Sequence, residues 1–191
     1  MAKKGLLIIL SGPSGVGKGT VRKIVMRDKK LNLAYSISMT TRKPREREQN
    51  GVDYFFVSEE EFKHNIAENN LLEYAEFVGN FYGTPRSYVE KLRNEGKNVI
   101  LEIEINGAQQ VLAKTDAENR VSIFLMPPSI EELENRFRHR RSEPEDIIQK
   151  RLEKARREMN MKDAYDYVVL NDNVDDAALA IKNIIRSNIK K

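Results

Sequence analysis

The feature that most constrains this chain is a glycine-rich loop between an apolar run and a helical pattern near the N-terminus. The apolar run, Leu6 to Leu10, is short, β-branched in its middle and flanked by glycines, which predicts a strand buried on both faces. The loop reads GPSGVGKGT over residues 12–20, and Val21 to Asp28 then carries apolar residues at helical spacing. A strand, a glycine loop and a helix in this order predict a phosphate-binding loop.

The chemistry of an anion site explains the residue types in this loop. Glycines adopt positive φ and let the backbone approach an anion closely. The N–H groups of the loop and of the helix start then point at the anion, and a lysine adds a cation for the β- and γ-phosphates. We therefore expect a nucleotide triphosphate here, bound by Gly12, Pro13, Ser14, Gly15, Val16, Gly17, Lys18, Gly19 and Thr20. The alternative is a glycine-rich turn with a solvated lysine, and the loop spacing, strand and helix together argue against it.

One position departs from the usual form of the motif. A Ser or Thr that ligates Mg²⁺ normally follows the lysine directly. Here that position is Gly19, and the hydroxyl comes one residue later, at Thr20. Two readings stay open: Thr20 hydrogen-bonds the α-phosphate while phosphates and water hold Mg²⁺, or the metal relies on acidic side chains elsewhere. No metal ligand is assigned.

Length and composition limit the class of protein. A chain of 191 residues suits one domain with small inserted lobes. Lys plus Arg (33) minus Asp plus Glu (29) gives a net charge of +4, with acids interleaved among the bases, so no nucleic-acid partner is expected. The absence of cysteine excludes disulfides and thiolate metal sites. The first apolar run is too short for a signal peptide and no later run could span a bilayer, so we expect a cytoplasmic protein with no membrane partner.

The segment 35–84 reads as an insertion that mixes short strands with one short helix. We expect strands over Tyr35–Ser38, Tyr54–Val57 and Leu71–Val78, and a turn or hairpin over 79–83. Ser58 is predicted to cap the short helix, with an acid three residues later completing a capping box.

The remainder alternates strands with helices. Buried strands are expected at 99–101, 121–125 and 167–170. Helix starts are expected at Thr84-Pro85, at Asn106 and at Ser129, followed by an arginine-rich helix to about residue 141, a long helix to about 162 and a final helix from 175. This alternation predicts an α/β fold, a parallel sheet with helices on both faces.

Several short motifs, in order, resemble those of the guanylate kinases. They are the glycine loop, SMTTRKPR at 38–45, GVDYFF at 51–56, GNFYGT at 79–84, PPS at 127–129 and VLND at 169–172. The resemblance covers essentially the whole chain. It implies a P-loop parallel sheet with an inserted mixed α+β monophosphate-binding lobe and a helical lid. A single domain, 1–191, would comprise a core (1–34, 85–126 and 165–191), a GMP-binding lobe (35–84) and a lid (127–164).

The resemblance also implies a GMP site. Arg42 and Arg45 would grip the GMP phosphate, because a guanidinium fork pairs two phosphate oxygens at once. A carboxylate at position 73 would accept the guanine N1–H and N2 amine together, which adenine does not offer. The implied GMP-binding set is Ser38, Arg42, Arg45, Tyr54, Glu73, Tyr82, Thr84, Glu102 and Glu104. Without the resemblance, Arg42 and Arg45 read as a solvated basic loop, Glu73 as an exposed strand acid, and one of the last two glutamates as an ion-pair partner of Arg42 or Arg45.

The arginines of the lid would neutralise charge on the transferred phosphoryl group. The implied catalytic set is Lys18, Arg42, Arg136, Arg140 and Arg151, and Asn171 would lie near the adenine of ATP. Related enzymes usually carry glycines beside the position of Arg140, where this chain has His139 and Arg141. His139 and His64 are both expected to be inert.

By resemblance, the expected function is transfer of the γ-phosphoryl group of ATP to GMP, giving ADP and GDP with Mg²⁺ as cofactor. This reaction would recycle GMP into precursors of GTP and dGTP, with dGMP as a second expected acceptor. Two alternatives remain: a non-catalytic protein-binding module of the same fold, and a kinase for another monophosphate. The intact loop with Lys18 favours an enzyme, and the choice between monomer and homodimer stays open.

Overall fold

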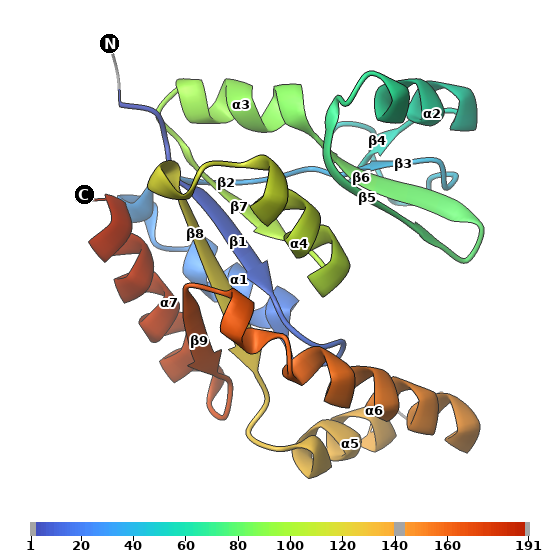
Figure 1. The fold of residues 1–191 in the computed structure, drawn as a ribbon, viewed down its shortest axis with the longest axis vertical. Helices are drawn as coiled ribbons and strands as arrows, with labels where there is room; N and C mark the ends of the chain where they lie inside the picture. The colour runs from blue at the N-terminus through green and yellow to red at the C-terminus, as the bar shows by residue number, and fades with distance from the viewer. Residues whose placement is uncertain (1–2, 140–143, 190–191) are drawn as a thin grey trace.

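A five-stranded parallel sheet forms the centre of the molecule (Figure 1). The structure is a computed structural model that describes residues 3–139 and 144–189. The strand order is β2-β7-β1-β8-β9. The bounds are β1 Leu7–Ser11, β2 Leu33–Tyr35, β7 Asn98–Glu102, β8 Arg120–Met126 and β9 Tyr167–Leu170. Every neighbouring pair is parallel, as the alternation of strands and helices predicts.

Helices cover both faces of this sheet because successive strand side chains point to opposite faces. Ile8 and Leu10 of β1 pack into a cluster with α1 (Lys18–Met26) and α7 (Val174–Ile189). Leu7 and Ile9 pack on the other face with α3 (Arg86–Asn94) and α4 (Ile105–Lys114). All four side chains are 0 or 1% exposed, so the predicted doubly buried strand is confirmed.

A second, smaller sheet lies to one side of the main sheet (Figure 1). Its order is β4-β3-β6-β5, with β3–β4 parallel and the other two pairs antiparallel. The bounds are β3 Met39–Thr40, β4 Phe55–Phe56, β5 Leu71–Phe77, β6 Asn80–Pro85 and, for the covering helix α2, Glu59–Ala67. Phe62 of α2 is fully buried and stacks on Phe81 with ring centroids 5.4 Å apart, so the lobe has its own small core.

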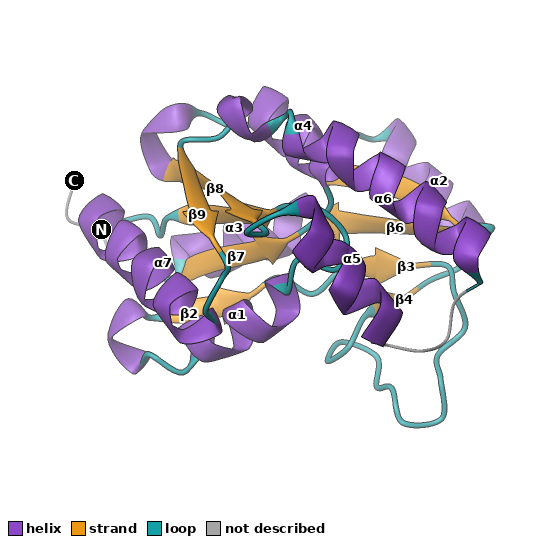
Figure 2. Cartoon of the chain, turned by 90° about the horizontal axis from the view of Figure 1, so that it is seen from below, coloured by secondary structure: helices purple, strands orange, loops and turns teal. Residues whose placement is uncertain are grey.

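Two helices, α5 (Ile130–His139) and α6 (Glu145–Met159), extend beyond the carboxyl ends of β1 and β8 (Figures 1 and 2). They pack on each other through a separate cluster that includes Leu133, Phe137, Ile148 and Leu152. Short 3-10 turns, η1 Lys29–Leu31, η2 Ala117–Asn119 and η3 Lys162–Ala164, complete the connections. Within the described residues, no helix is long and apolar enough to cross a membrane.

Two predicted helix caps are confirmed. The hydroxyl of Ser58 accepts a hydrogen bond from the Glu61 amide at 3.1 Å, and that of Ser129 accepts one from the Glu132 amide at 3.1 Å. Both hydroxyls satisfy an amide that the first turn of a helix leaves without an internal partner.

Other predicted boundaries are wrong. The strand at Tyr35 ends there and does not reach Ser38. The predicted hairpin exists, but it turns at Val78 and Gly79, both at positive φ, so residues 80–83 belong to strand β6. Thr84 lies in β6 and does not cap α3, and its hydroxyl donates to Glu73 instead. Asn106 lies inside α4, and the N-cap of that helix is Glu104.

Candidate active site

The glycine loop connects β1 to α1 at the carboxyl end of the central strand, where ligands bind in sheets of this kind. Gly17 precedes the helix at φ 99°, in the left-handed region that a side chain disfavours. Gly12 approaches the neighbouring strand so closely that a Cβ there would lie 2.3 Å from the Leu125 carbonyl oxygen. The glycines therefore allow the loop to fold tightly over the start of α1.

Lys18 curls back over this loop. Its ammonium donates to the carbonyl oxygens of Gly12 at 2.6 Å and Pro13 at 3.0 Å. Burial lowers the pKa of Lys18, and the nearby carboxylates of Glu102 and Glu104 oppose that shift. A buried ammonium beside the loop amides is suited to bind phosphate oxygens, because an anion compensates the desolvation of the charge.

Two cavities adjoin the loop. One, of about 430 Å³, is lined by Lys18, Gly19 and Thr20 together with Glu102 and Glu104. The other, of about 400 Å³, is lined by Gly17, Thr20, Arg136, His139, Asn171 and Asp172, among others. Gly15, Gly17 and Thr20 line both cavities.

The predicted residues Arg136, Arg151 and Asn171 all contact the loop. The amide of Asn171 donates to the Val16 carbonyl oxygen at 2.7 Å, so this side chain supports the loop backbone. Arg136 donates to the same oxygen at 3.3 Å. Arg151 donates to the Ser14 hydroxyl at 3.0 Å. Arg140 and Arg141 lie outside the described residues.

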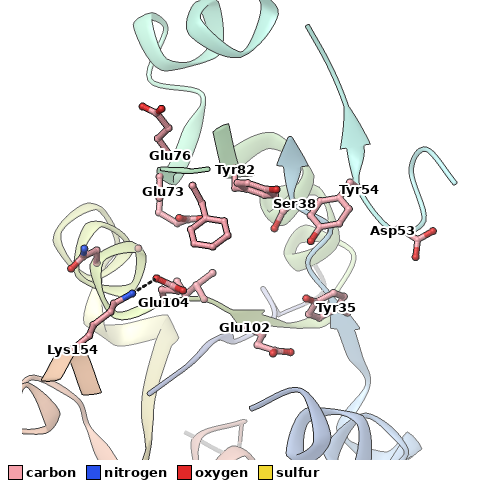
Figure 3. A pocket seen from close by; sticks show the side chains of 16 residues that line it. Tyr35, Ser38, Asp53, Tyr54, Glu73, Glu76, Tyr82, Glu102, Glu104 and Lys154 are labelled. Carbon is pink, nitrogen blue, oxygen red and sulfur yellow. Dashed lines mark hydrogen bonds and ion pairs between the residues drawn. The ribbon is translucent and has the colours of Figure 1, made fainter. Parts of the chain in front are cut away.

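A third cavity, of about 540 Å³, lies between the small sheet and the end of β7 with α4 (Figure 3). The side chains of Ser38, Tyr54, Glu73 and Tyr82 form its upper wall in the figure. The opposite wall holds Tyr35, Glu102, Glu104 and Lys154. Six of the predicted GMP-site residues therefore line a single cavity.

Glu73 is the buried acid of this cavity, at 7% exposure. The Thr84 hydroxyl donates to its Oε1 at 2.6 Å, and Gly107 of α4 lies against its other oxygen, Oε2. Burial raises the pKa of Glu73, and the bond from Thr84 and the charge of Lys114 oppose that shift. Burying a carboxylate is costly unless its oxygens accept hydrogen bonds, so this acid is suited to a ligand that offers donors.

The two predicted phosphate arginines lie outside the set that lines the cavity. Arg42 forms two hydrogen bonds, of 2.8 and 2.9 Å, with the carboxylate of Glu48, and its guanidinium lies 5.4 Å from the Tyr54 ring centroid. Arg45 is exposed, and its main-chain amide donates to the same carboxylate at 2.8 Å. Glu48 therefore holds this loop together in the structure, and sequence reasoning missed it.

Glu102 and Glu104 have partners that the sequence did not suggest. Glu102 pairs with Arg22 of α1 at 2.6 Å, and Glu104 with Lys154 of α6 at 3.3 Å. The alternative was that one of them pairs with Arg42 or Arg45. The structure contradicts it, because Arg42 pairs with Glu48 and the two glutamates pair with Arg22 and Lys154. The sequence does place Arg22 on the same helix face as Lys18, four residues later, and so near the loop. It does not indicate the partner of Arg22, because Glu102 is 80 residues away.

Comparisons with known proteins agree with this geometry. The family model described as guanylate kinase matches residues 4–188. A guanylate kinase from Mesoplasma florum is 58% identical over 97% of this chain, which spans only 62% of that relative's length. One from Bacillus cereus is 57% identical over 96% of this chain and 89% of its own length. The guanylate kinase from Anaplasma phagocytophilum, known from a crystal structure, is 36% identical in sequence. The match covers 100% of this chain and 89% of that chain, with a TM-score of 0.76.

These matches confirm the predicted fold and enzyme class and give no support to the binding-module alternative. The chain belongs to the guanylate kinase family.

Proposed function

We propose that this chain transfers the γ-phosphoryl group of ATP to GMP, giving ADP and GDP. One observation carries the proposal: the cavity that holds the buried Glu73 and the cavity of the glycine loop share Glu102, Ile103 and Glu104 as a common wall. Acceptor and donor would therefore meet at this wall with their phosphates adjacent.

The acceptor site selects guanine through Glu73. Guanine presents N1–H and the N2 amine side by side, and one carboxylate accepts both. Ser38 serves the O6 side of the base, while Thr84 gives its one hydroxyl proton to Glu73 and so orients that carboxylate. A polar site left unpaired by the wrong base discriminates strongly. Arg42 and Arg45, with the phenols of Tyr54 and Tyr82, bind the phosphate. GMP has to compete with Glu48 for the Arg42 fork, so binding reorganises this loop.

The donor site binds ATP along the loop 12–20, with Asn171 on the adenine side. Lys18 turns from the carbonyls of Gly12 and Pro13 to the β- and γ-phosphates. Arg136 and Arg151 already contact the loop and offset charge on the transferred group. We keep Arg140 in this set from the sequence.

The residues at the loop suit a magnesium ion that arrives with ATP. Among the described residues no group of three or more His, Cys, Asp or Glu could hold a metal alone. A carboxylate oxygen of Glu102 does lie 3.4 Å from the position that a Cβ on Gly19 would take, and carboxylate and phosphate oxygens are the donors that Mg²⁺ prefers. Glu102, which lines the same cavity as Lys18 and Gly19, would therefore hold it, and the ion would neutralise phosphate charge.

The transfer itself needs positioning and no covalent protein intermediate. Water would hydrolyse ATP if it reached the γ-phosphate, so we propose that the lobe 35–84 and the lid 127–164 close over the core 1–34, 85–126 and 165–191. Such an enzyme would feed GTP and dGTP synthesis, and we expect it in the cytoplasm.

The test is a coupled assay of ADP release with Mg²⁺ and ATP against GMP, dGMP, AMP, CMP and UMP in turn. We expect rapid turnover with GMP, a measurable rate with dGMP, and rates at least about a hundredfold lower with the others. Equal rates with AMP and GMP would reject the role of Glu73. No turnover with any acceptor would reject the enzyme itself.

A further inference from the structure

The shared wall of the two cavities contains a carboxylate that has to be held in place. Glu102, Ile103 and Glu104 line both the cavity of about 540 Å³ and the cavity of about 430 Å³ at the loop. In the proposed reaction two phosphate groups meet here. The Glu102 carboxylate would repel these phosphates and attract the magnesium ion between them, so its direction matters for both nucleotides.

Arg22 holds Glu102 from the side of α1. Its Nε lies 2.6 Å from Oε2 of Glu102, and the two side chains are 18% and 20% exposed. The guanidinium also lies 4.1 Å from the centroid of the Tyr35 ring, which lines the acceptor cavity. A guanidinium held by an ion pair and an aromatic face is fixed in both position and plane.

Gly19 lets the carboxylate approach the loop. A Cβ at this position would lie 3.4 Å from Oε1 and 3.9 Å from Oε2 of Glu102, so the carboxylate packs directly beside the glycine backbone. Arg22 lies one helical turn after Lys18, so the helix that presents the loop lysine also presents the partner of Glu102.

We propose that Arg22 is a positioning residue that fixes the Glu102 carboxylate on the wall between donor and acceptor. Arg22 would act through its ion pair with Glu102 and its contact with the Tyr35 ring, both of which line the acceptor cavity. This inference rests on the proposed function. The alternative is that this ion pair has a structural role only and holds α1 against β7.

The experiment is a double-mutant cycle of Arg22→Gln, Glu102→Gln and the double variant. The readouts are kcat and KM for each nucleotide, GMP affinity by calorimetry without ATP, and Tm. Arg27→Gln is the matched control, because Arg27 is exposed at the end of the same helix and the substitution removes the same charge.

We expect Arg22→Gln to lower kcat/KM for GMP by about tenfold and to weaken GMP binding, with Glu102→Gln at least as damaging. The double variant should be no worse than Glu102→Gln alone, because Arg22 has no role once the carboxylate is gone. Arg22→Lys should recover part of the loss, and Arg27→Gln should match the wild type.

Two results would overturn the positioning role. In the first, the fold losses in kcat/KM of the two single variants multiply in the double variant. In the second, Tm falls while kcat/KM and GMP affinity stay unchanged, which fits a purely structural ion pair. If Arg22→Gln fails to fold, the cycle is run with Arg22→Lys and judged by the same criterion. If the wild type is active and Arg22→Gln has the same kcat/KM and GMP affinity, this inference alone is rejected. If the wild type is inactive, the proposed function is rejected.

Discussion

Replacing Gly107 by alanine tests whether the guanine reader is set by its neighbours. Gly107 lies in α4, and a Cβ there would be 2.7 Å from Oε2 of Glu73 and 3.2 Å from its Cδ. Real Cβ atoms essentially never come within 3.0 Å of a heavy atom outside their own residue and its chain neighbours, so the carboxylate has to move. It has little freedom, because its other oxygen is held by Thr84 at 2.6 Å and the side chain is buried.

The strand that carries Glu73 is fastened as well. The amide of Gln110 on α4 donates to the Tyr74 carbonyl at 2.9 Å and accepts from the Tyr74 amide at 3.1 Å. Strand and helix therefore cannot separate cheaply to make room for an extra methyl. The carboxylate rotates instead, and the hydrogen bond from Thr84 lengthens.

Loss of one such buried hydrogen bond and misalignment of the guanine contacts costs about 1.4–2.7 kcal/mol, which is about 10- to 100-fold in GMP affinity. The stability of the fold should change little, since alanine gains about 1 kcal/mol of helix propensity and the overpacking costs about 1–3 kcal/mol. Binding of ADP should stay at the wild-type value, because the lining of the loop cavities includes neither Gly107 nor Glu73 among the described residues.

The assay is calorimetry of GMP and of Mg-ADP with the purified variant, together with a thermal melt. The control is Ala113→Gly, an exposed position on the same helix, which should lower stability by about 1 kcal/mol and leave GMP affinity unchanged. A Gly107→Ala variant that binds GMP within twofold of the wild type would refute the reasoning. So would equal losses for GMP and ADP.

Three further predictions concern the same two sites. Lys18→Met should lower kcat by at least about a thousandfold while the thermal melt stays cooperative, because the ammonium is the charge that meets the γ-phosphate; near-normal turnover would remove the loop from the mechanism. Glu73→Gln should weaken GMP far more than ADP in calorimetry, and it should also raise Tm at pH 7. Burial raises the pKa of Glu73, so the wild type is most stable below the unfolded pKa of about 4.3 and loses stability as pH rises through the folded value. The Tm advantage of the variant should therefore grow from pH 4 to pH 7, and a constant difference would contradict this. Arg42→Lys should weaken GMP by about tenfold or more but leave guanosine binding unchanged, since only GMP carries the phosphate that the guanidinium fork grips; a parallel loss for guanosine would argue for a disturbed lobe instead.

Local patterns in the sequence predicted the elements that depend on local physics. The apolar run before the loop, the glycines and the helix behind them lie within about twenty residues, and the structure has each of them. The caps at Ser58 and Ser129 were also predictable, because a side-chain oxygen and an amide three residues later suffice. The GMP-site assignment rested on the resemblance, since no local pattern distinguishes Glu73 from a solvated acid.

The errors have a common cause. Thr84-Pro85 has the local signature of a helix start, yet Thr84 pairs in β6 and donates to Glu73, since a buried carboxylate outcompetes a helix end that water can reach. The strand predicted through Ser38 ends at Tyr35, because β2 pairs with β7 while Met39 and Thr40 already pair with the small sheet.

The sequence by itself determined the loop and the alternation that makes a parallel sheet, because hydrophobic period, glycine freedom and capping are read within a few neighbours. Only the tertiary structure decided which charges meet: Arg22 with Glu102, Lys154 with Glu104, and the Glu73 carboxylate with the bare face of Gly107. Such contacts join residues 34 to 80 positions apart, and burial at their meeting point, which no local pattern encodes, sets the strength of each pair.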